Sequence, residues 1–92
     1  MNKSELVQRV AGRAGLSSGQ AAGAVEATLA AIEAELAAGG EVAISGFGRF
    51  SVAARAARQA RNPRTGEPID VPAGRAPRFS PGSQLKRAVA DA

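Results

Sequence analysis

Apolar residues recur with helical spacing through the first part of the chain. The clearest run has intervals of 4, 3 and 4 positions and consists of Val25, Leu29, Ile32 and Leu36. Such a run forms one stripe along a helix of about twenty residues. An earlier pair, Leu6 and Val10, has the i, i+4 spacing of a shorter helix that ends at Gly15. The pattern therefore predicts two N-terminal helices.

Both helices begin with residues that favour a capped start. Glu5 follows Asn2 by three positions, and Gln20 follows Ser17 in the same way. In such pairs each side chain accepts a hydrogen bond from the other residue's backbone N–H. The glycine pair at 39–40 follows the second stripe and predicts the end of its helix.

The period changes from helical to alternating after this glycine pair. Residues 41–44 predict a short strand, and residues 45–46 predict a turn. A longer strand follows, whose apolar positions alternate with polar or small ones: Phe50, Val52, Ala54 and Ala56. The apolar side chains shrink to alanine along this strand, so the hydrophobic core should end near Ala57.

A tight turn is predicted at the tip of a hairpin that follows. Asn62 and Pro63 suit the first two corners of a type I turn, and Gly66 suits the left-handed position that closes it. Residues 67–71 would then return antiparallel to residues 55–61. Prolines in the returning strand cannot donate to a ladder, which favours a two-stranded ribbon over a central strand. Because this ribbon has no hydrophobic face, a ligand is needed to order it.

These elements predict an α+β fold. It has two N-terminal helices, a three-stranded antiparallel sheet with a long protruding β-hairpin arm, and a short C-terminal helix that begins at Pro81-Gly82-Ser83. The chain should be one domain, residues 1–92. Its expected parts are a helical part (1–40), a sheet body (41–54 and 75–82), an arm (55–74) and a final helix (83–92).

The composition indicates that one copy of the chain cannot build a sufficient core. Alanine supplies 22 of the 41 apolar residues, and there is no cysteine for a disulfide and no histidine. A domain of 92 residues is marginal even with large core side chains. Self-association is the remaining way to bury enough apolar surface. A cytoplasmic protein is expected, since the polar start of the chain does not resemble a signal peptide.

Charge is distributed unevenly along the chain. Residues 1–48 hold three basic and five acidic side chains, a net of −2, whereas residues 49–92 hold nine basic and three acidic, a net of +6. Ten of the twelve basic residues are arginine, the residue type suited to bidentate phosphate contact. The asymmetry predicts an N-terminal scaffold and a C-terminal half that faces a polyanion.

Catalysis is poorly supported by the sequence. There is no His, Cys or Tyr to act as a base or nucleophile near neutral pH. Glu26, Glu33 and Glu35 lie in the second helix, where they also argue against a membrane span. Glu67 and Asp70 lie on the basic hairpin, where we expect them to pair with arginines. We therefore expect no enzyme, metal, cofactor or small-molecule substrate, and we disfavour a metal-dependent nuclease.

The hairpin and the sequence just after it carry the candidate chemistry. Six arginines outnumber the two acidic residues there. They are Arg55, Arg58, Arg61, Arg64, Arg75 and Arg78. A nucleic acid would order such an element through phosphate contacts that need no particular sequence. Duplex is favoured over single strands or RNA loops, because the chain lacks Trp and Tyr for base stacking. Pro63 is either a turn former or also an apolar wedge that enters a base step.

Four segments together resemble one known family. They are MNKSEL at the start, Gly46 to Phe50, Arg61 to Gly66, and Phe79 with the following Pro81-Gly82 and Leu85-Lys86. In this order and spacing, over essentially the whole chain, they resemble the bacterial HU / integration host factor family of histone-like DNA-bending proteins, and HU most of all. The resemblance implies an intertwined dimer, joined by its helical part, whose two arms reach into the minor groove.

The resemblance also implies roles for individual residues. Pro63 would intercalate at each arm tip. The candidate DNA contacts are Lys3, Gly46, Arg55, Arg58, Arg61, Asn62, Pro63, Arg64, Arg75, Arg78, Ser83 and Lys86. The candidate dimer core is Leu29, Ile32, Leu36, Phe47, Phe50 and Phe79. The chain departs from the family at Ser80 and Ser83, where members often carry lysine, so its body contacts should be weaker.

The sequence thus predicts a homodimer that binds double-stranded DNA with little sequence preference and bends and compacts it in the bacterial nucleoid. Two alternatives stay open. One is a subunit of a site-specific heterodimer like integration host factor, which we disfavour because nothing in the chain is suited to reading base edges in the major groove. The other is a small RNA-binding protein.

Overall fold

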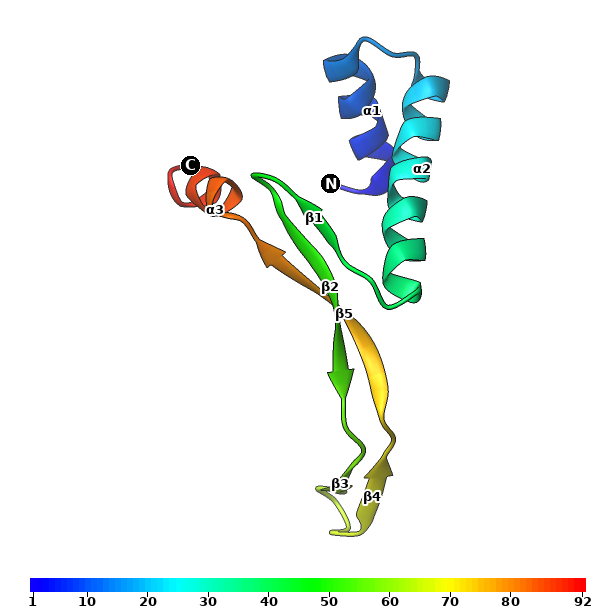
Figure 1. Cartoon of the computed structure of the whole chain (residues 1–92), viewed down its shortest axis with the longest axis vertical. Helices are drawn as coiled ribbons and strands as arrows, with labels where there is room; N and C mark the ends of the chain where they lie inside the picture. Colours follow the sequence, from blue (N-terminus) through cyan, green and yellow to red (C-terminus); the bar gives the residue numbers. More distant parts are fainter. The chain divides into compact units, whose positions relative to one another are not determined.

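The computed structural model describes all 92 residues and confirms the α+β class (Figure 1). In chain order the elements are α1 (Lys3–Ala14), α2 (Ser18–Ala37), β1 (Val42–Ile44), β2 (Gly48–Arg55), β3 (Arg58–Arg61), β4 (Pro68–Val71), β5 (Gly74–Pro81) and α3 (Ser83–Ala90). The chain divides into two compact units, Met1–Glu35 and Leu36–Ala92. The division into functional parts that the sequence suggests stays a prediction.

The first unit is a helical hairpin whose starts were predicted correctly. The Asn2 side chain accepts a hydrogen bond from the Glu5 N–H at 2.9 Å, and α1 ends at Gly15, which adopts the left-handed conformation with φ 67°. Ser17 and Gln20 bond reciprocally, at 3.1 and 3.2 Å, at the start of α2. These local bonds satisfy backbone donors that a helix start would otherwise leave free.

Little of either unit is buried. Only Ala21 and Val25 are buried, both in α2, whereas Leu29 of the same stripe is 44% exposed. A shallow apolar groove lined by Leu6, Val10, Val25 and Leu29, among others, lies along the helical hairpin. The predicted shortage of core is therefore visible in the single chain. None of the three helices combines the length and apolar character needed to cross a membrane.

The second unit contains the predicted three-stranded sheet, in the antiparallel order β1-β2-β5. The long strand predicted to contain Phe50, Val52, Ala54 and Ala56 ends earlier than expected: β2 stops at Arg55, and a separate ladder of β3 and β4 follows. Both ladders keep one register, since Arg55 pairs with Gly74 and Arg58 with Val71. That register places Pro72 opposite residue 57. Pro72, which has no N–H to donate, therefore lies within the break.

The turn between β1 and β2 is hydrogen-bonded to the start of α3. The Gly82 N–H donates to the Phe47 carbonyl at 2.8 Å, and Gly46 has the left-handed φ of 80°. Gly48 follows, and a Cβ there would lie 2.7 Å from the ring of Phe79 and from the Ser80 carbonyl. Only glycine fits between these groups without a shift of the ring or backbone.

Replacing Gly48 with alanine should therefore destabilise the fold. We expect a loss of about 1–3 kcal/mol, the usual cost of overpacking, measured by urea denaturation at fixed protein concentration. Gly74→Ala is the matched control, because it is also a strand glycine and its Cβ would meet nothing within 4 Å. Equal stability of the two variants would show that the close approach at Gly48 has no energetic consequence.

Candidate nucleic-acid interface

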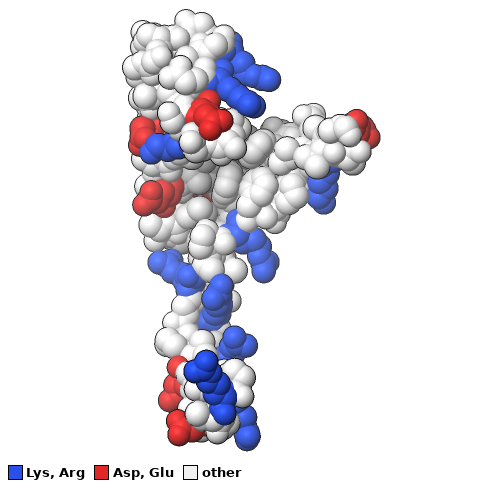
Figure 2. Space-filling model, turned by 180° about the vertical axis from the view of Figure 1, so that it is seen from behind, with Lys and Arg blue, Asp and Glu red and all other residues white.

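The arm presents a row of exposed arginines (Figure 2). Arg55 lies at the end of β2, Arg58 and Arg61 lie at the two ends of β3, and Arg64 lies in the tip loop. Arg78 is exposed on β5, in the body of the sheet. Five arginines thus lie along one projecting hairpin and its root, all in the second unit.

The acidic residues of the arm do not neutralise these arginines. The expectation that Glu67 and Asp70 pair with arginine is wrong: Asp70 instead accepts a hydrogen bond from the Gln59 amide at 3.4 Å. The ion pairs of the chain are Lys3 with Glu26, and Arg49 with Glu41. The arm arginines are therefore free to meet phosphate without first leaving a carboxylate.

The tip loop is held by bonds to Asn62 that leave Pro63 exposed. The Asn62 carbonyl accepts from the Gly66 N–H at 2.8 Å, and its side-chain oxygen accepts from the Arg64 N–H at 2.9 Å. Gly66 has the predicted left-handed conformation, with φ 72°. The closing bond joins residues four apart, so the turn is one residue wider than the predicted type I turn. Asn62 is thus a structural residue whose side-chain N–H₂ stays available to a ligand.

Alternation along β2 and β5 sorts side chains onto two faces of the sheet. The paired register places on one face Arg49, Ser51, Arg55, Arg78 and Ser80. The opposite face carries Phe50, Val52, Pro77, Phe79 and also Arg75. Arg49 was missed as a candidate although its spacing from Arg55 is even, which is the signal for a shared face. Arg75, by the same rule, does not share a face with Arg78.

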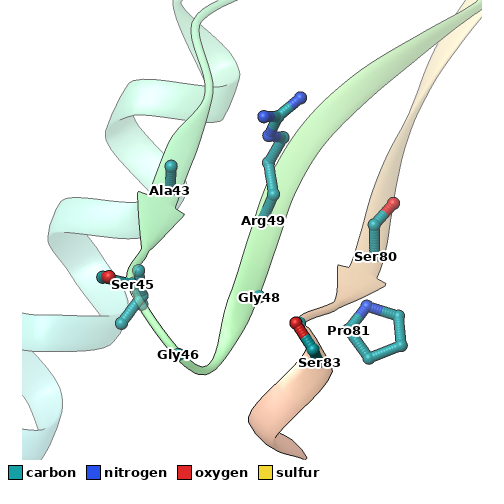
Figure 3. A pocket seen from close by; sticks show the side chains of 10 residues that line it. Ala43, Ser45, Gly46, Gly48, Arg49, Ser80, Pro81 and Ser83 are labelled. Carbon is teal, nitrogen blue, oxygen red and sulfur yellow. The ribbon is translucent and has the colours of Figure 1, made fainter. Parts of the chain in front are cut away.

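A shallow pocket lies between the β1–β2 turn and the start of α3 (Figure 3). Its lining includes Ser45, Gly46, Arg49, Ser80, Gly82 and Ser83. Gly82 is the N-cap of α3 and no side chain caps the helix, so the N–H groups of its first turn lack protein partners. A helix start with free N–H groups favours an anion. The structure thus brings together Gly46 and Ser83, two of the predicted contacts.

The remaining body candidates lie elsewhere. Lys86 is exposed on α3, beyond the pocket lining. Lys3 belongs to the helical unit, and its ammonium group pairs with Glu26. A phosphate that binds Lys3 must therefore replace this carboxylate.

The predicted dimer-core residues present unpartnered apolar surface in the single chain. Phe47 and Phe79 are 45% and 40% exposed, and their ring centroids lie 5.6 Å apart. Phe50 lies 4.8 Å from Phe79, so the three rings form one cluster in the second unit. In α2, Leu29 is exposed and Ile32 and Leu36 are half-buried. The clustering fits a surface that another molecule covers.

Comparison with known proteins identifies the family. The model of the family described as "Bacterial DNA-binding protein" matches residues 1–90. The chain belongs to this family of bacterial DNA-binding proteins. It is 49% identical to DNA-binding protein HRm of Rhizobium meliloti, covering 97% of this chain and 99% of that protein. It is 48% identical to DNA-binding protein HU of Geobacillus stearothermophilus, with the same coverage.

Solved structures agree with these relatives. An HU–DNA cocrystal structure from Anabaena matches with a TM-score of 0.90 and 40% identity, and the match covers all of both chains. HU from Thermotoga maritima matches with a TM-score of 0.68 and 31% identity, over 97% of this chain and 98% of that one. The resemblance to HU inferred from the sequence is confirmed. Membership of a DNA-binding family also supports the expectation that the chain is not an enzyme.

Proposed function

We propose that this protein is a histone-like architectural protein that binds double-stranded DNA as a homodimer and bends it with little sequence preference. Its family and its likeness to HU support binding to DNA. The observation that carries the proposal is the arm, which has four exposed arginines between Arg55 and Arg64 and no ion pair. Phosphate contacts by such residues release counterions and give affinity independent of base sequence.

Bending would come from the arm tips. Pro63 is exposed at the tip, and the bonds that shape the loop go through Asn62, so the ring is presented on a fixed turn. An apolar ring of this kind can enter a base step from the minor groove and hold it open. The arginines on either side would then follow the phosphates away from the kink. Two tips per dimer would kink the duplex twice.

Body contacts would extend the bound site beyond the arms. The pocket of Figure 3 offers free N–H groups, serine hydroxyls and, once its ion pair with Glu41 is replaced, Arg49 to one phosphate. Arg49, Arg55 and Arg78 share one face of the sheet and would continue the contact toward the arm. Lys86 and Lys3 would add contacts from the helices. In this scheme residues 1–40 serve dimerisation, residues 55–74 form the DNA-binding arm, and the protein acts on the bacterial nucleoid.

The first test compares ligands and sequences. Fluorescence transfer between dyes at the ends of a duplex of about 30 base pairs measures the bend, whose elastic cost is of order 1–6 kcal/mol. We expect similar affinity and bending on several unrelated sequences, and weak competition by an RNA duplex of equal length. A strong preference for one sequence would favour the heterodimeric, site-specific alternative, and equal competition by RNA would refute duplex DNA as the preferred ligand.

Replacing Arg61 with alanine should weaken binding about equally on all sequences. Each phosphate contact contributes about 0.9 to the slope of log affinity against log salt concentration, so the slope should fall by about 2 per dimer. Salt titrations of wild type and variant measure this difference. Arg13→Ala is the control, because it removes the same charge from α1, outside the proposed interface. An equal change of slope in both variants would mean that net charge, and not the arm, determines binding.

A further inference from the structure

Arg75 differs from the other arginines near the arm because its side chain already has a protein partner. Its Nη2 donates to the backbone carbonyl of Ala37 at 3.3 Å. Its Nη1 lies 3.5 Å from the position that a Cβ on Gly39 would occupy. Both groups belong to the unit Leu36–Ala92, as Arg75 does. The guanidinium thus sits at the C-terminal end of α2.

This end of α2 lacks any cation of its own. The last carbonyls of a helix have no partner within the helix, and they carry the negative end of its dipole. Helix α1 has Arg13 in its last turn and α3 has Arg87, whereas α2 has no basic residue there. A residue 38 positions later in the chain supplies the missing donor and charge.

The register of the sheet supports the same role. Arg75 pairs with Ala54 and projects on the face that carries Phe79 and Pro77, opposite to the face of Arg78. One rung further, Arg55 pairs with Gly74 in the last pair before the ladder is interrupted. The contact with Ala37 therefore fastens the sheet at the point where the arm leaves it.

We propose that Arg75 is a positioning residue that caps α2 and fixes the root of the arm, and that it makes no phosphate contact. Without the cap, the final rungs of the β2–β5 ladder would open more often, and Arg55 would lose its fixed place on the polar face. The part of this inference that concerns phosphate rests on the proposed function. The capping itself does not, because it is a property of the free protein.

The test pairs Arg75→Gln with Arg78→Gln, two variants that each remove one positive charge from β5. In the free protein we expect Arg75→Gln to accelerate amide exchange at Gly39, whose N–H bonds to the Leu36 carbonyl, by about 2- to 5-fold. Arg75→Lys should restore most of the protection, because it keeps a cation that can donate. Arg78→Gln should leave exchange at Gly39 unchanged.

Salt titration on duplex DNA supplies the second readout. Arg78→Gln should lower the log–log slope by about 2 per dimer, and Arg75→Gln should leave it unchanged. A fall of the slope in Arg75→Gln would overturn the absence of a phosphate contact, and unchanged exchange at Gly39 would overturn the cap. If neither variant changes the slope while exchange at Gly39 accelerates, the cap stands and the proposed DNA-facing role of Arg78 is refuted.

Discussion

Replacing Pro63 with alanine should remove most of the DNA bend while leaving the salt dependence of binding nearly unchanged. The substitution removes no charge, so the number of phosphate contacts should stay the same. It removes the ring that is proposed to hold a base step open. Without the ring, nothing offsets the free-energy cost of bending. Affinity for intact duplex should therefore fall by about tenfold, a loss whose free energy lies within the 1–6 kcal/mol that bending requires.

The structure indicates that this variant keeps its turn. The closing bonds run from Gly66 to the Asn62 carbonyl and from Asn62 to the Glu67 carbonyl, and neither involves Pro63. The bond from Arg64 to the Asn62 side chain is also independent of it. A lost bend would therefore reflect the missing ring and not a collapsed loop.

Fluorescence-transfer bending on intact and nicked duplexes measures this effect. The loss should be largest on intact DNA and smallest on DNA nicked at the kink, where unstacking costs less. Pro68→Ala is the matched control, because it removes an exposed proline from the same arm but at β4, opposite Arg61. If Pro63→Ala bends intact duplex as well as wild type, Pro63 is only a turn former and the wedge mechanism is wrong.

Elements specified by short stretches of sequence could be predicted, and they agree with the structure. The cap residues Asn2 and Ser17 bond to residues three positions away, so their role is visible in the sequence itself. The left-handed glycine of the arm tip is of the same kind. These features need no knowledge of the rest of the fold.

Features that depend on a distant partner were missed. The strand break near residue 57 lies opposite Pro72, a pairing that is visible only once the register is known. Arg75 donates to a backbone carbonyl 38 residues earlier, a partner that its charge alone could not reveal, and its DNA contact stays a prediction. Asp70 was expected to pair with an arginine, but the register brings Gln59 across from it. The amino-acid composition predicted the basic arm, whereas strand register and hydrogen bonding determine which arginines have no protein partner.

Replacing Phe47 with alanine should cause a large loss of stability if the protein is a dimer, and this substitution is the sharpest test of dimerisation. Phe47 in the β1–β2 turn and Ile69 on the arm are both 45% exposed in the single chain, so a monomer would tolerate loss of either side chain about equally. If a second copy covers the phenylalanine cluster, Phe47→Ala should cost about 3–5 kcal/mol per chain, the usual loss for a buried phenylalanine. Ile69→Ala, which lies outside the proposed dimer core, should cost much less.

Denaturation at several protein concentrations measures both the loss and its cause. Because folding and association are linked, the unfolding midpoint of wild type should rise with protein concentration. Phe47→Ala should lower the midpoint and shift sedimentation toward monomer at micromolar concentration, and Ile69→Ala should do neither. A folded wild-type monomer at that concentration, or equal losses in the two variants, would refute the dimer. With only Ala21 and Val25 buried, we expect the single chain to have too little core to fold alone.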